Sequence, residues 1–405
     1  MTKTLLLGLG GTGSRVVNNV AKELRRKKIG INDGEVCCAV LDTNEKDNKL
    51  ILKTGTSIPV IPTSKDQTIG DYFEEYDHLN LTQWAPDTPS FRKQRMINGA
   101  SEMRVKSRIA FLDTVNSGRI HDLEKEIVKI LDLRDSSDIR VLLISSLSGG
   151  TGSGMFIQVA LWLRKFFDSR NSEVSIRGIF LLPDIFVNNV ENIGGNPKKK
   201  IAHYANAYAA IRELNTLNKI IVQGYRPDKR IVIDDLFDSD NPDARPVFDN
   251  AFFLDSVNAR GKSFNTVGAY EEYAAQLAYM QLFAPMVDEL VSVEDNLYRD
   301  LVAADEPIYG ACGTSRALYP TQDVLEYCAL CAGEEALATG WQKLDKEINR
   351  QIEQENAEIL AGDRNVQSDP RDLYVELFDE KSNKKKEEIG TDGLFVSIKN
   401  DVNIE

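Results

Sequence analysis

The sequence predicts an α/β protein whose mostly parallel sheet carries helices on both faces, followed by a long central helix and a smaller C-terminal α+β region. Two observations support this fold class. Apolar runs of strand length alternate with segments that have apolar residues at helical spacing. Glycine-rich turns also join a strand to a helix at two places, "GLGGTG" (8–13) and "SGGTGSG" (148–154). Because ligands bind at the carboxyl ends of parallel strands, both turns are expected at one edge of the sheet.

The individual elements follow from the local pattern. Strands are expected over 4–11, 35–44, 138–147, 174–184, 229–237 and 250–257. Helices are expected over 14–28, 69–79, 101–115, 121–133, 158–167, 198–217 and 268–287. The remainder of 45–100 is poorly periodic and contains four prolines, so only its helix is predicted.

Composition limits the possible functions. The chain has 405 residues, of which 42% are hydrophobic and 27% charged, as in an ordinary globular protein of about two domains. Its net charge of −13 argues against a nucleic-acid partner. No window approaches the roughly 18 apolar residues of a membrane span, and the apolar run at the N-terminus is too short for a signal peptide. We therefore expect a cytoplasmic protein without a membrane span.

Cysteine usage gives little support for a metal or redox site. Cys328 and Cys331 have C-x-x-C spacing, but there is no second cysteine pair and the chain has only three histidines. The prediction is that the cysteines are buried thiols and that no protein metal centre exists.

The two glycine turns predict an anion site. Glycine lets backbone N–H groups close on a ligand, and the helix that follows each turn adds roughly half a positive charge at its N-terminus. The hydroxyls of Ser148, Thr151 and Ser153 can supplement these donors, so a di- or triphosphate is expected. The alternative, in which the glycines serve only tight packing, stays open. Valine at Gly152 is expected to enter the cradle and abolish nucleotide binding while leaving the fold.

A dinucleotide-binding domain is the strongest rival interpretation. Gly8, Gly10 and Gly13 fit G-x-G-x-x-G, and Asp42 ends the second strand where an acidic residue would hold a ribose. The spacing from Gly13 to Asp42 exceeds the usual ~20 residues, however, and this interpretation assigns no role to the second glycine loop. A P-loop enzyme is not indicated, because neither loop continues into "GK[ST]".

The two turns also resemble those of the tubulin/FtsZ superfamily of GTP-binding filament proteins. "GGTGSG" is similar to the family's phosphate loop G-G-T-G-[ST]-G, and "LGLGGTGSRVVNNV" to the first nucleotide loop and helix of FtsZ. "LDTN" and "NGASEMRVKSRIA" resemble the second and third loops, the third with an arginine near the terminal phosphate. Element order and insertions favour the divergent prokaryotic tubulin-like branch. The resemblance implies GTP or GDP with Mg²⁺, held by Gly10, Gly11, Thr12, Gly13, Asn18, Asp42, Asn44, Gly99, Ala100, Arg108, Ser148, Gly149, Gly150, Thr151, Gly152, Ser153 and Gly154.

The resemblance further implies base-contacting asparagines and a catalytic acid supplied by a second subunit. Asn206 and Asn265 are the candidates for the base, with a helix cap or a solvated amide as the alternative for each. For hydrolysis, the acidic loop after the central helix enters the pocket of the next subunit. In this chain that region offers Asp288, Glu289 and Asp295, but it lacks the family patterns N-x-D-x-x-D and N-x-D-x-x-E.

The C-terminal third departs from the family. Residues 334–360 predict one long charged helix that packs on its own protein or docks an unidentified partner, and 395–405 predict a strand at which the chain stops, as a truncated chain would. The expected divisions are a nucleotide-binding domain (1–268), a central helix with its acidic loop (269–305) and a divergent C-terminal region (306–405).

The expected function is therefore GTP binding with head-to-tail self-assembly into filaments and GTP hydrolysis at the subunit interface. Two alternatives stay open: a GTP-binding scaffold or switch that does not hydrolyse nucleotide, and an NAD-type dinucleotide-binding enzyme. Guanine is preferred to adenine on the resemblance alone.

Overall fold

The computed structural model describes most of the first 283 residues and one later helical segment. By backbone contacts the chain divides into two units, Met1–Ser315 and Arg316–Glu405. The described residues are 3–27, 29, 31, 35–44, 58–79, 81–96, 99–131, 138–189, 196–223, 246–258, 260–283, 296, 309–311 and 321–361.

A seven-stranded, entirely parallel sheet forms the centre of the first unit, with the order β3-β2-β1-β4-β5-β6-β7. This confirms the predicted fold class. The order reverses direction between β1 and β4, and such a switch point opens a crevice at the carboxyl ends of the strands. The strands are β1 (Lys3–Leu9), β2 (Val36–Asp42), β3 (Val60–Pro62), β4 (Ile139–Ser146), β5 (Val174–Leu181), β6 (Asn250–Leu254) and β7 (Tyr309–Gly310).

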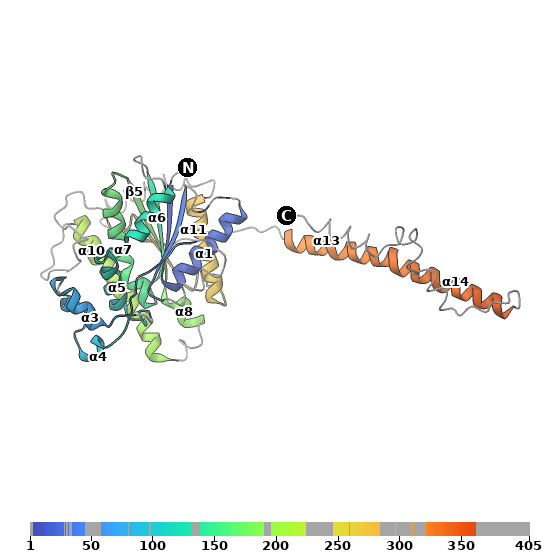
Figure 1. Ribbon diagram of the computed structural model, residues 1–405, viewed down its shortest axis with the longest axis horizontal. Helices are drawn as coiled ribbons and strands as arrows, with labels where there is room; N and C mark the ends of the chain where they lie inside the picture. The colour runs from blue at the N-terminus through green and yellow to red at the C-terminus, as the bar shows by residue number, and fades with distance from the viewer. Residues whose placement is uncertain are drawn as a thin grey trace. The chain divides into compact units, whose positions relative to one another are not determined.

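Helices cover both faces of the sheet (Figure 1). On one face lie α1 (Gly10–Arg26), α8 (Pro183–Asn189) and α11 (Val267–Phe283). The other face carries α6 (His121–Leu131), α7 (Gly150–Asp168) and α10 (Pro197–Gln223), and α5 (Arg104–Asn116) packs against α7.

Alternating side chains of the buried strands supply both cores. Leu5, Leu7 and Leu9 of β1 face the α6/α7 layer, whereas Leu6 faces the α1/α11 layer. A third, smaller apolar cluster joins α5 to α3 (Ile69–Glu75), η2 (Leu81–Gln83) and α4 (Pro89–Arg92), and η1 (Asp77–Leu79) lies between α3 and η2 in the chain.

Several element boundaries differ from the sequence prediction. Helix α7 begins at Gly150, so most of the glycine-rich stretch is helical, and α5 begins at Arg104 because Ser101 and Glu102 have left-handed backbone conformations. Strand β3 was not predicted, since Pro59 precedes it and Pro62 is its last residue. Prolines are tolerated there because β3 is an edge strand. The predicted strands 229–237 and 395–405 lie outside the described residues.

The described part of the second unit is helical. Helix α13 (Thr321–Ala336) continues through a π-helical turn, η3 (Leu337–Trp341), into α14 (Gln342–Leu360), so the predicted helix starts earlier than expected. Cys328 and Cys331 are exposed on α13, so the prediction of buried thiols was wrong for this pair and right for Cys37 and Cys38. Within the described ranges, no helix combines the length and apolar character needed to cross a bilayer.

Candidate functional site

The two glycine turns meet at the switch point of the sheet. Strand pairing places Leu9, the last residue of β1, beside Ser145 of β4. Gly10 follows with a φ of +68°, and a Cβ built on it would lie 3.1 Å from the Cβ of Thr151 in α7. Helices α1 and α7 cover opposite faces of the sheet, so their N-termini flank the crevice between β1 and β4. Both positive helix ends are therefore directed at one place.

Within the second turn, glycine serves packing at three positions and leaves open space at one. A Cβ at Gly150 would lie 2.7 Å from the backbone nitrogen of Met103, and one at Gly152 would lie 1.9 Å from Oγ of Ser145. A Cβ at Gly154 would lie 2.2 Å from the carbonyl oxygen of Arg104. At Gly149 a Cβ would meet nothing within 4 Å.

These contacts correct the expectation for Gly152. A valine side chain there would meet the end of β4 instead of entering the cradle, so this substitution would disturb the fold as well as the site. The packing interpretation thus holds for three of the four glycines, and the anion site remains a prediction. Gly150, Gly152 and Gly154 permit close packing, and Gly149 borders open space at the start of α7.

The second loop joins the site through Thr43, which sequence reasoning did not single out. Its Oγ1 lies 2.6 Å from Oγ1 of Thr151 and accepts a hydrogen bond from the Ala100 N–H at 3.1 Å. Asp42 is buried, and its Oδ1 accepts from the Asn44 N–H at 3.0 Å. Thr43 thus connects three loops, although the only signal in the sequence was its place within "LDTN" at the end of a strand.

The third loop holds three residues in the left-handed region. Gly99, Ser101 and Glu102 have φ values of 78°, 49° and 63°. Left-handed backbone costs about 1 kcal/mol or more at a non-glycine residue and persists only where the surroundings hold it. Strain of this kind is concentrated at functional sites.

Helix α10 holds this strained loop against the phosphate loop. The Asn206 amide donates to the carbonyl oxygens of Glu102 (2.9 Å) and Ser148 (3.1 Å). One turn earlier, His203 Nδ1 lies 2.6 Å from Ser148 Oγ and 2.9 Å from the Ser148 carbonyl oxygen. The structure therefore places Asn206, a predicted base contact, where its two amide hydrogens join two loops. His203 was not predicted, because a lone histidine in a helix carries no motif.

Arg104 contacts the second glycine turn. Arg104 Nε donates to the Ser153 carbonyl oxygen at 3.0 Å, and its guanidinium pairs with Glu213 of α10. The guanidinium of Arg108 stacks over the ring of Trp84, 4.4 Å from the ring centroid. Arg108 was the predicted arginine, and Arg104, one helical turn earlier in the same helix, was not singled out.

Gly11, Thr12 and Gly13 lie in the first turn of α1, and the remaining predicted site residues have other settings. Asn18 is buried on α1, and Asn265 is exposed two residues before α11 begins. The predicted catalytic acids Asp288, Glu289 and Asp295 lie outside the described residues.

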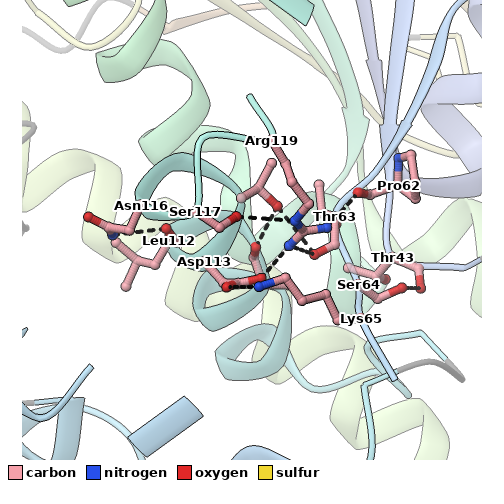
Figure 2. A network of polar contacts seen from close by, with 12 residues as sticks. Thr43, Pro62, Thr63, Ser64, Lys65, Leu112, Asp113, Asn116, Ser117 and Arg119 are labelled. Carbon is pink, nitrogen blue, oxygen red and sulfur yellow. Dashed lines mark hydrogen bonds and ion pairs between the residues drawn. The ribbon is translucent and has the colours of Figure 1, made fainter. Parts of the chain in front are cut away.

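A buried polar network around Asp113 supports the loop that follows β2 (Figure 2). Asp113 is fully buried and accepts hydrogen bonds from Lys65 Nζ and Tyr76 OH, each at 2.7 Å, and from Arg119. Burial and the hydrogen bond to Asp113 raise the pKa of Tyr76, so the phenol remains a donor. Ser64, beside Lys65, donates to the Thr43 carbonyl oxygen at 2.9 Å. The network therefore fixes the backbone from which Thr43 projects.

An ion pair links α1 to α11. Arg15 Nε donates to both carboxylate oxygens of Glu271, at 2.8 and 3.0 Å. The Glu271 side chain is 6% exposed and that of Arg15 52%. Burial raises the pKa of Glu271, and Arg15 offsets this effect only in part.

The raised pKa of Glu271 predicts that this residue lowers the stability of the folded protein as the pH rises. A carboxyl whose pKa is higher in the folded than in the unfolded chain contributes stability below the unfolded pKa and loses it as the pH rises through the folded pKa. Glu271→Gln removes this titration, so the variant should gain stability relative to wild type as the pH rises above the ordinary glutamate pKa of about 4.3. Urea unfolding of both proteins at several pH values measures the difference. A difference that does not change with pH would contradict the expectation.

A parallel sheet with two glycine turns at its switch point is an architecture of nucleotide-binding α/β proteins. The profile of the family described as "Tubulin like" matches residues 5–338, and the chain belongs to this family. No curated protein matches the sequence.

Solved structures with a similar fold are remote in sequence. CetZ2 from Haloferax volcanii, described as a GTPγS-bound protofilament, is 12% identical over 80% of this chain and 62% of its own, with a TM-score of 0.37. CetZ1 from the same organism, a GDP-bound monomer, is 14% identical over 68% and 58%, with a TM-score of 0.38. TubZ of Clostridium botulinum phage c-st is 10% identical over 69% and 61%, with a TM-score of 0.35. The chain thus spans less than two thirds of the length of these proteins.

Proposed function

We propose that this protein binds GTP together with Mg²⁺ at the junction of the two glycine turns and assembles head to tail with copies of itself. The approach of Gly10 to Thr151 between two helix N-termini, in a chain of the tubulin-like family, carries the proposal. Helix N-termini offer free N–H donors and a positive dipole end, which suit a polyphosphate. GTP and filament formation come from the family, since the site's chemistry alone does not select guanine.

The residues present fit such a ligand. Gly149 borders space that a side chain would fill, and the hydroxyls of Thr43 and Thr151 lie at the same junction. Among the described residues, no three His, Cys, Asp or Glu side chains converge as a metal site would require. Mg²⁺ does not need such a cluster, because it usually binds through phosphate oxygens, water and one or two carboxylates. Asp42 is the nearest buried carboxylate in the second loop.

Hydrolysis is proposed to be completed where two subunits meet. When bound, Mg²⁺ neutralises charge on the triphosphate. Asp288, Glu289 and Asp295, which follow α11, are the candidates for the carboxylate that orients the attacking water in the neighbouring subunit's pocket. The family's patterned acidic motif is missing, so a scaffold that binds GTP without hydrolysing it is the second candidate function.

Assembly-coupled hydrolysis predicts a concentration-dependent rate. Phosphate released from GTP per mole of protein is expected to rise with protein concentration and to fall at least about tenfold in the triple variant Asp288→Asn, Glu289→Gln, Asp295→Asn. Sedimentation of both proteins with GTPγS serves as the control for assembly. Turnover of zero at every concentration, with GTP bound, would leave only the scaffold.

Identification of the bound nucleotide separates these functions from dinucleotide chemistry. The strand order of this sheet also occurs in dinucleotide-binding enzymes. Mass spectrometry of the ligand released by denaturing the purified protein is expected to detect GDP or GTP. NAD without guanine nucleotide would overturn the proposed function.

A further inference from the structure

Ser148, the residue before the open glycine, carries a buried hydroxyl in contact with a buried histidine. Ser148 is 1% exposed and His203 is 6% exposed. His203 Nδ1 lies 2.6 Å from Ser148 Oγ and 2.9 Å from the Ser148 carbonyl oxygen. Two atoms of one residue therefore share one ring nitrogen.

The carbonyl oxygen favours the form of His203 that carries a proton on Nδ1. A carbonyl can only accept a hydrogen bond, so a ring nitrogen 2.9 Å from it is favourable only as an N–H donor. With its proton on Nδ1, His203 donates toward both Ser148 oxygens, and the Ser148 hydroxyl accepts. The hydroxyl's own hydrogen must then point elsewhere. Among the described residues, Ser148 Oγ makes no side-chain hydrogen bond other than that with His203, and a buried hydroxyl hydrogen without an acceptor is unfavourable.

The surroundings indicate what would accept this hydrogen. Gly149, the next residue, is the position of this turn where a built Cβ meets no atom, and α7 begins directly after it. Asn206 and His203 both contact the Ser148 carbonyl oxygen and so hold the main chain of this residue in place. An anion at the start of α7 is the acceptor that this geometry leaves for it.

We infer that the Ser148 hydroxyl donates a hydrogen bond to a phosphate of the bound nucleotide and that His203 is the positioning residue that fixes this direction. The inference rests on the proposed function. The proposed hydrogen bond adds one side-chain donor to the backbone N–H donors of the glycine turns. Its direction is set from α10, a helix that does not follow a glycine turn. His203 Nε2 has no hydrogen-bond partner among the described residues and lies 3.8 Å from Glu102 Oε1, so the Nδ1 side of the ring makes the contact that matters here.

Four variants test this arrangement by equilibrium binding of fluorescent mant-GTPγS and mant-GDP. Ser148→Ala removes the donor and is expected to weaken binding about tenfold. His203→Gln, whose amide lies near the position of Nε2, should weaken binding similarly, whereas His203→Asn, which places an amide near Nδ1, should stay within about twofold of wild type. In the double variant Ser148→Ala, His203→Gln, the loss should equal that of Ser148→Ala alone.

The double variant distinguishes positioning from general support of the fold. If His203 only stabilised the loop, His203→Gln would weaken binding by the same factor with or without the Ser148 hydroxyl, and that outcome overturns the inference. Unchanged affinity of a folded Ser148→Ala, checked by its melting temperature, overturns it as well. Loss for mant-GTPγS alone assigns the contact to the terminal phosphate, and loss for both nucleotides assigns it to an inner one. Wild-type protein that binds neither nucleotide would overturn the proposed function itself.

Discussion

Alanine at Gly154 is expected to destabilise the folded protein by about 3 kcal/mol and to lower its melting temperature by about 6–12 °C. A Cβ there would lie 2.2 Å from the Arg104 carbonyl oxygen and 2.0 Å from Ser107 Oγ, so α7 and α5 must separate. Ser107 donates to the Gly150 carbonyl oxygen at 2.7 Å, and this contact would be lost with the separation. Thermal unfolding followed by circular dichroism measures the effect.

The matched control for this prediction is alanine at Gly149. The same methyl group added there meets no protein atom within 4 Å, so the melting temperature should stay within about 2 °C of wild type. If a phosphate occupies that space, GTPγS affinity should fall at least about tenfold in this folded variant. Equal melting temperatures for the two variants would show that close packing at Gly154 does not limit stability.

Alanine at Asp113 is expected to remove about 3–5 kcal/mol of stability, because it leaves Lys65 and Arg119 without the carboxylate that they share. Tyr76 would also lose the acceptor of its hydroxyl in a buried position. The second loop should become less well held, since the segment of Lys65 and Ser64 supports Thr43. Urea unfolding gives the stability, and amide hydrogen exchange at residues 42–44 reports on the loop.

The comparison for Asp113 is Asp66, which pairs with Arg95 on the surface. Their side chains are 56% and 54% exposed, and exposed pairs contribute about 0–1 kcal/mol. Asp66→Ala should therefore change stability by less than about 1 kcal/mol. A similar loss in both variants would mean that burial does not set the contribution of Asp113.

The sequence predicted the sheet and the placing of both glycine turns because these depend on local patterns. Apolar runs of strand length and helical periodicity define each element without knowledge of its neighbours. The role of each glycine could not be read in this way. Gly149 and Gly152 look equivalent in "GGTGSG", but one borders open space and the other meets Ser145.

Residues that act through distant contacts also escaped prediction. His203 and Asn206 are separated from Ser148 by more than 50 positions, and Asp113 lies 48 positions from Lys65. No pattern in the sequence links such pairs. The predicted arginine, Arg108, stacks over Trp84, which a poorly periodic segment contributes, whereas Arg104, which was not predicted, donates to the Ser153 carbonyl oxygen.

Helices α1 and α7 leave adjacent strands and run along opposite faces of the sheet. A ligand bound by the N-termini of both helices would contact the helical layers on both faces of the sheet at the same time. Loss of a terminal group from that ligand would therefore change its contacts with both helical layers directly, without a structural change in the strands between them.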